Sequence, residues 1–169
     1  MTELLLLRVV HILAGTCWLG TVLVNTLFLM PAVGRVGAPG GLVMKALTER
    51  GILRWLFGSS VLTLLSGMRL LSILAANAPG VFFQSRMGHM FMAAGSAALL
   101  AFLVAMMVIR PSHARAAVLL GRAGDASEAD RRALQEQAAR LRARAGMASA
   151  ANVALLVASV TGMAVARYL

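Results

Sequence analysis

Four stretches of this chain are apolar over lengths that can cross a membrane as a helix. About 20 apolar residues, rising 1.5 Å each, span the hydrocarbon core of a bilayer. In chain order the stretches are Leu4–Met30, Ile52–Ala76, Gln84–Ile109 and Met147–Leu169. The pattern predicts an all-α fold, an integral membrane four-helix bundle that forms a single domain over residues 1–169.

The polar region between the third and fourth stretches is predicted to hold one further helix. Asp125 is placed to cap its N-terminus, with Glu128 three residues on. Small and apolar residues then recur at helical spacing: Ala126, Ala129, Ala133, Leu134, Ala138, Leu141 and Ala145. We expect a cytoplasmic amphipathic helix over about 125–145, which either extends the fourth span or lies on the inner membrane surface.

The connection after the first stretch is predicted to be a loop. Pro31 marks the end of the first span, and Val33–Gly41 is rich in glycine and contains Pro39. The first stretch continues through Met30, which is too long for a cleaved signal peptide, so we expect it to be retained.

Composition agrees with a membrane protein. The chain is 60% hydrophobic and 13% charged, with a mean hydropathy of +0.83. A chain of this composition is not expected to be soluble in water as a monomer. No span contains an acidic residue, so proton-coupled transport and acid–base hydrolysis lack their usual carriers.

The sixteen basic residues predict the orientation. Twelve lie in the first and third connections and at their edges, and the other four are Arg8, Arg69, Arg86 and Arg167. The positive-inside rule then places both termini and the Asn77–Phe83 turn outside the cytoplasm, in a bacterial-type inner (plasma) membrane. The net charge of +10 is therefore mainly topological, and no motif indicates a nucleic-acid partner.

The tetrapeptide pattern Arg-x-x-His occurs twice, once near the start of each odd-numbered span. The copies are Arg8-Val9-Val10-His11 and Arg86-Met87-Gly88-His89. The histidines lie about 10 Å and about 8 Å from the outer ends of their spans, nearly at one level. Intramembrane ionisable residues are functional candidates by default. Two imidazoles on different helices suit the axial positions of one b haem, which predicts His11 and His89 as ligands of its iron.

Three arginines are candidate partners for the haem propionates. Arg8 and Arg86 precede their histidines by one helical turn, and Arg69 reaches the same level from the second span. A guanidinium pairs well with a carboxylate. The alternative is that these side chains only extend to the membrane interface.

The two halves of the chain also show signs of duplication. Ser66-Gly67-Met68 in the second span and Thr161-Gly162-Met163 in the fourth are each followed by an arginine, Arg69 and Arg167. Two hairpins would thus share the order Arg-x-x-His and then [Ser/Thr]-Gly-Met, as in a parallel repeat about an axis along the membrane normal.

The first span resembles that of a known superfamily. The run His11-Ile-Leu-Ala-Gly-Thr-Cys-Trp18-Leu-Gly20, followed by an apolar segment ending at Pro31, is similar to the copper-resistance-protein-D-like proteins, whose relatives include the HemJ-type protoporphyrinogen oxidases. The resemblance implies a four-span layout and a b haem held through His11. HemJ-type proteins place a lysine where this chain has His89, and their Tyr-Leu-Pro-Arg stretch is missing here. A second imidazole would favour electron transfer over porphyrinogen oxidation.

Copper is the alternative ligand, because Met87, Met90 and Met92 flank His89 and thioethers suit Cu(I). These methionines do not all share one helix face, which favours ordinary packing. Cys17 is the only cysteine and cannot form a disulfide within the chain, and His113 is predicted to be interfacial.

The resulting hypothesis is a membrane b-type cytochrome that exchanges electrons with a quinone or an outer-side redox partner, with haem-dependent oxidoreductase activity left open. Alternatives are a copper-handling transport protein, a HemJ-like oxidase and a structural accessory subunit. The small residues of 93–98 would permit a homodimer.

Overall fold

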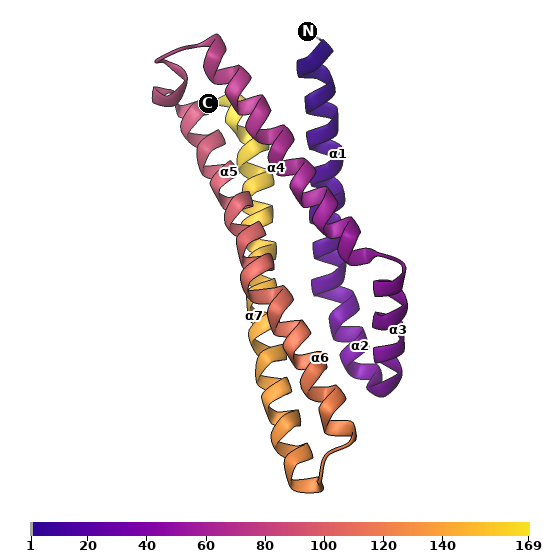
Figure 1. The fold of residues 1–169 in the computed structure, drawn as a ribbon. Coiled ribbons are helices and arrows are strands. Elements are labelled where there is room, and N and C mark those ends of the chain that lie inside the picture. Colours follow the sequence, from indigo (N-terminus) through magenta and orange to yellow (C-terminus); the bar gives the residue numbers. More distant parts are fainter. Residues whose placement is uncertain (1) are drawn as a thin grey trace.

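The protein is all-helical over residues 2–169, which are the residues that the computed structural model describes. Its helices join into four long rods, shown in Figure 1. The first rod is α1 (Thr2–Val24), η1 (Asn25–Leu29) and α2 (Met30–Val36); the second is α4 (Ile52–Asn77); the third is α5 (Arg86–Val104), η3 (Ala105–Ile109) and α6 (Arg110–Gly124); the fourth is α7 (Glu128–Val165) and η4 (Ala166–Tyr168). Two shorter helices, α3 (Ala38–Glu49) and η2 (Phe82–Gln84), lie in the connections.

The four rods form two antiparallel hairpins that lie side by side. Helix α1 packs along α4, and α7 packs along both α5 and α6. Narrower contacts join α1 to α7 and α4 to α5, whereas no Cα atom of α1 lies within 8 Å of one in α5 over the described residues. Both chain ends and the turn between α4 and α5 lie at the upper end in Figure 1. The first and last described helices therefore end on the same side of the molecule, as an even number of antiparallel rods requires.

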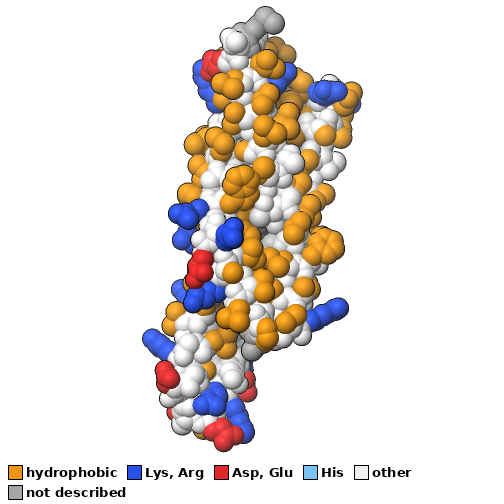
Figure 2. All heavy atoms as spheres, turned by 90° about the vertical axis from the view of Figure 1, so that its right-hand side faces the viewer, with side chains coloured by type: hydrophobic (Ala, Val, Ile, Leu, Met, Phe, Trp, Pro, Cys, Tyr) orange, Lys and Arg blue, Asp and Glu red, His pale blue; other side chains and the backbone are white. Residues whose placement is uncertain are grey.

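Most of the apolar surface of the rods is not covered by protein. Each rod contains a window of low charge and high hydropathy long enough to cross a membrane, and at most 17% of any window is buried. Leu6, Ile12 and Leu65 are 66%, 63% and 59% exposed. Figure 2 shows a band of hydrophobic side chains on one face, with charged side chains above and below it. This distribution is compatible with a multi-pass membrane protein.

Two π-helical segments each precede a proline. Segment η1 (Asn25–Leu29) is followed by Pro31, and η3 (Ala105–Ile109) by Pro111. Proline has no N–H to donate to the backbone carbonyl four residues earlier, and its ring clashes with that carbonyl. A wider π-helical turn accommodates the proline without ending the helix. The prediction that Pro31 ends the first rod is therefore wrong, because the rod continues to Val36.

The predicted loop over Val33–Gly41 is also wrong. Helix α2 runs to Val36 and α3 begins at Ala38, so the break is confined to Gly37. Gly37 has a φ of 73°, a value that glycine adopts easily, and Pro39 lies in the first turn of α3, where it has no N–H to lose. The glycine-rich composition therefore produces one sharp turn between two helices.

The helix predicted over about 125–145 is the first half of α7, which is continuous from Glu128 to Val165. Of the two alternatives for this helix, extension of the fourth span is the one observed. Its N-cap is Ser127, whose hydroxyl accepts from the backbone N–H of Asp130, so the prediction of Asp125 as the cap is wrong. From the predicted row of small and apolar residues, Ala138 and Ala145 are buried, and this half of the helix packs on α6.

Small side chains let the rods approach closely around one large residue. Trp18 is 4% exposed and packs in a cluster with Ala98, Ala101 and Leu156. Along α7 and η4, five buried positions with small or polar side chains recur every seven residues, with Leu156 buried between them: Ala138, Ala145, Asn152, Ser159 and Ala166. A strict seven-residue repeat of small residues is the pattern by which antiparallel helices pack tightly along their length.

Asn152 interrupts this repeat with a polar side chain, and its removal should stabilise the fold. The residue is 2% exposed, and its Oδ1 has no hydrogen-bond partner among the described residues. Leaving a buried acceptor unpaired costs about 1–3 kcal/mol. Asn152→Leu, of similar volume, should raise the free energy of unfolding by about that amount, as measured by reversible denaturation in mixed micelles. A loss of stability would mean that the amide has a partner.

Candidate functional site

His11 lies on the packed face of α1 and is anchored to α4. At about 100° per residue it is only about 20° from Trp18 around the helix axis. Its Nδ1 is 2.9 Å from the backbone oxygen of Thr63 and 3.3 Å from Oγ of Ser66. A carbonyl oxygen can only accept, so Nδ1 carries the proton and donates. In this tautomer Nε2 is the ring nitrogen that is left free to bind a metal.

Ser66 and Thr63 are held in position by their own helix. The Ser66 hydroxyl donates to the carbonyl of Leu62 at 2.6 Å, and the Thr63 hydroxyl donates to the carbonyl of Ser59 at 2.7 Å. The hydroxyl hydrogen of Ser66 is thereby committed, and its oxygen remains an acceptor for His11. Both side chains are buried, so the orientation of the imidazole is determined by a rigid, mostly dehydrated surface.

Gly67 makes this contact possible. A Cβ at position 67 would lie 2.8 Å from Cε1 of His11, 3.2 Å from Nδ1 and 3.7 Å from Nε2. The first distance is shorter than a normal van der Waals contact, so any larger residue would displace the ring. The Nδ1–Cε1 edge therefore lies against α4, and Nε2 is the ring nitrogen farther from it. Nε2 has no hydrogen-bond partner within residues 2–169.

This arrangement is the one found for histidines that bind metals. A ligating histidine usually donates its second N–H to a carbonyl or carboxylate, which sets the tautomer and the ring orientation. His11 has that donor contact, an open Nε2 and a half-buried position. No group of three His, Cys, Asp or Glu side chains that could hold an ion occurs in the described part of the chain. A single histidine fits a metal whose other ligands come with it, as in a porphyrin.

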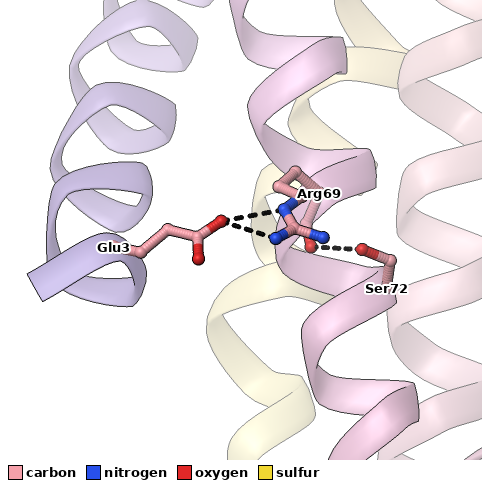
Figure 3. Close-up of polar contacts among 3 residues, drawn as sticks. All are labelled: Glu3, Arg69 and Ser72. Carbon is pink, nitrogen blue, oxygen red and sulfur yellow. Dashed lines mark hydrogen bonds and ion pairs between the residues drawn. The ribbon is translucent and has the colours of Figure 1, made fainter. Parts of the chain in front are cut away.

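Arg69 already has a carboxylate partner within the chain. Its Nη2 and Nε lie 2.7 Å and 2.9 Å from Oε1 of Glu3, as Figure 3 shows, and the hydroxyl of Ser72 donates to the Arg69 carbonyl. This ion pair joins the N-terminal end of α1 to the C-terminal half of α4. Both side chains are more than half exposed, so the pair adds at most about 1 kcal/mol to stability. Arg8 and Arg86 are exposed and form no ion pair among residues 2–169.

His89 does not meet His11 in this structure. It is exposed, whereas the buried residues of α5 include Ala94 and Ala98. Around the helix axis His89 lies about 140° from Ala94 and about 180° from Ala98. Because His11 faces α4 and His89 lies on the exposed side of α5, the two imidazoles predicted to share a ligand are directed to different surroundings.

His89 does not correspond to His11 because the two Arg-x-x-His copies are out of register with the repeat between the two hairpins. Ala14-Gly15-Thr16 and Ala94-Gly95-Ser96 match at a separation of 80 residues, as do the two π segments and the two prolines that follow them. The Arg-x-x-His copies are separated by 78 residues. Two residues correspond to about 200° of rotation. The helices therefore repeat, and the counterpart of His11 is Phe91.

The second [Ser/Thr]-Gly pair also has a different neighbour. A Cβ at Gly162 would lie 3.0 Å from Cβ of Ala94 and 3.5 Å from the sulfur of Met90. Gly67 and Gly162 thus serve the same purpose, close approach to the first helix of their hairpin, but only Gly67 faces an imidazole. Met90 is half-buried in this contact, while Met92 is exposed.

The remaining candidates lie elsewhere. Cys17 is a partly buried free thiol, and His113 is exposed on α6. Two surface grooves have volumes of about 360 and 270 Å³: one is lined by Ala114, Arg115, Val118, Leu119, Arg122 and Leu141, the other by Gly20, Thr21, Val24, Asn25, Leu29 and Ile52. Neither includes a histidine. The functional part that the sequence pattern missed is the Thr63 carbonyl, which no side-chain motif signals.

No protein-family model matches this chain, and no curated protein or solved structure is significantly similar to it. Its function is therefore inferred from its own residues.

Proposed function

We propose that this chain is a membrane-embedded b-type cytochrome that holds one haem through His11 and passes electrons to or from a quinone or an outer-side partner. The observation that supports this most directly is the hydrogen bond from Nδ1 of His11 to the Thr63 carbonyl, with Nε2 left open. Haem, when bound, supplies one-electron redox chemistry at its iron. The Arg-x-x-His pattern and the resemblance of the first span to b-haem proteins agree with this assignment.

The residues of this chain would have distinct tasks toward the haem. His11 would hold the iron. The Thr63 carbonyl and Ser66 would orient the imidazole by accepting its N–H. Arg8 and Arg86, which have no ion-pair partner in the described chain, are the better candidates for the propionates, because Arg69 is paired with Glu3.

Spectroscopy of the purified protein tests the haem. The wild type should show a Soret band, and His11→Ala should lose it, because the chain then has no oriented imidazole on this face. His113→Ala is the matched control and should keep the band, since that residue lies on α6. A colourless protein that carries stoichiometric copper would instead favour copper handling, and a colourless, metal-free protein that fails to take up added haem would favour a structural subunit.

We further propose that the rods span the bacterial inner membrane with both termini outside the cytoplasm. Cys17→Ser removes the only thiol, after which single cysteines can be placed at the exposed Asn77 and Gly124. A membrane-impermeant thiol reagent should label position 77 in cells with a permeabilised outer envelope, and position 124 only after the inner membrane is broken. The reverse pattern would invert the orientation.

A further inference from the structure

The structure indicates which residues of this chain would ligate a haem iron, and this inference rests on the haem function proposed above. The sequence pattern predicted two axial histidines. In the structure His11 alone has the position and the second hydrogen bond of a ligand, and His89 lies on the exposed side of α5. A second ligand from α5 would have to lie on the face of that helix that packs against the rest of the protein.

The packed face of α5 offers no free nitrogen donor. Phe91, the counterpart of His11 in the 80-residue register, has no donor atom at all. Met90 carries a sulfur on this face, but that sulfur packs 3.5 Å from the point where a Cβ would stand on Gly162, within its own hairpin. To bring His89 to this face, α5 would have to rotate by about 140–180° about its axis.

Such a rotation would remove Ala94, Ala98 and Ala101 from the contacts in which they are buried. Ala94 packs against Gly162, and Ala98 and Ala101 pack in the cluster around Trp18. Close packing of small residues holds membrane helices together, so α5 is held in its present orientation by the whole length of its contact with α7.

We propose that His11 would be the only residue of this chain to ligate the iron of a bound haem, so that a small exogenous ligand could also bind the iron. The ligand class is a compact molecule with a lone pair for iron, such as carbon monoxide for the ferrous form or cyanide for the ferric form. The step forms one coordinate bond, transfers no electron and releases at most a water. The protein would then be suited to binding or reacting with a small molecule at the iron, in addition to electron transfer.

Carbon monoxide is the probe that tests this. The full chain, purified with its haem and reduced with dithionite, should bind one CO per haem with a shift of the Soret band, and the ferric form should be high-spin by electron paramagnetic resonance. His89→Ala and Met90→Leu should leave the spectrum and the CO affinity unchanged, because neither side chain touches the iron. His11→Ala should abolish the signal.

The contrary results are equally specific. A low-spin wild type that refuses CO, with CO binding gained only in His89→Ala, would overturn the inference in favour of two histidines. The same gain confined to Met90→Leu would overturn it in favour of a histidine and a methionine. In both cases the haem function stands. A chain that binds no haem even after reconstitution would overturn the haem function itself.

Discussion

Gly67→Ala should weaken haem binding by about 10–100-fold without unfolding the protein. The added methyl group would stand 2.8 Å from Cε1 of His11 and push the ring off α4, which breaks the bond from Nδ1 to the Thr63 carbonyl. Losing the outer partner of a ligating histidine typically lowers metal affinity by this factor. Titration of haem into the purified apoprotein measures the effect directly.

Gly58→Ala is the matched control, on the same helix. No atom within 4 Å would meet a Cβ at position 58, so the substitution should leave haem affinity unchanged. Alanine is a better helix former than glycine by about 1 kcal/mol, so neither variant is expected to destabilise α4 through backbone propensity. Circular dichroism confirms that both remain helical. Equal haem affinity in the two variants would show that haem binding does not depend on the contact between the His11 ring and Gly67.

Trp18→Ala should cost about 3–5 kcal/mol of stability. Trp18 is the largest side chain of its cluster, which also includes Ala98, Ala101 and Leu156 from the other hairpin. Alanine there would leave a void between hairpins that otherwise touch only through narrower contacts. Within a membrane the loss is mainly one of van der Waals packing, since lipid is as apolar as the core.

Reversible unfolding in mixed micelles measures this loss, with Trp55→Ala as the control. Trp55 is on α4 but 55% exposed, and its replacement should change the free energy of unfolding by less than about 1 kcal/mol. If both tryptophans contribute equally, the cluster around Trp18 is not what joins the hairpins.

The helical rods were predictable because each depends on local composition. The second stretch was predicted as Ile52–Ala76 and forms α4 over Ile52–Asn77, and the third begins at Arg86 in place of Gln84. The predictions were wrong at prolines, because proline occurs in more than one kind of local structure. Pro31 ends many helices but is accommodated here by the π turn η1, and Pro39 was assigned to a loop but starts α3.

The site was predictable in part. His11 was predicted as a ligand because it is an ionisable residue inside an apolar stretch, and the structure places it on the same face of α1 as the buried Trp18. The residues of α4 that contact His11 were harder to predict. The Ser66-Gly67 pair forms a recognisable motif, but a motif does not show which residue packs against it. The Thr63 carbonyl is a backbone atom, and every residue has one.

The sequence alone thus determined four apolar helices and singled out two histidines inside them, since hydropathy and spacing are local properties of the chain. Tertiary structure decided that His11 is held by α4 and that His89 is turned away from it. The physical reason is rotation about a helix axis: a two-residue difference in register turns a side chain by about 200°, and only the packing of Ala94, Ala98 and Ala101 against their neighbours sets which way α5 faces.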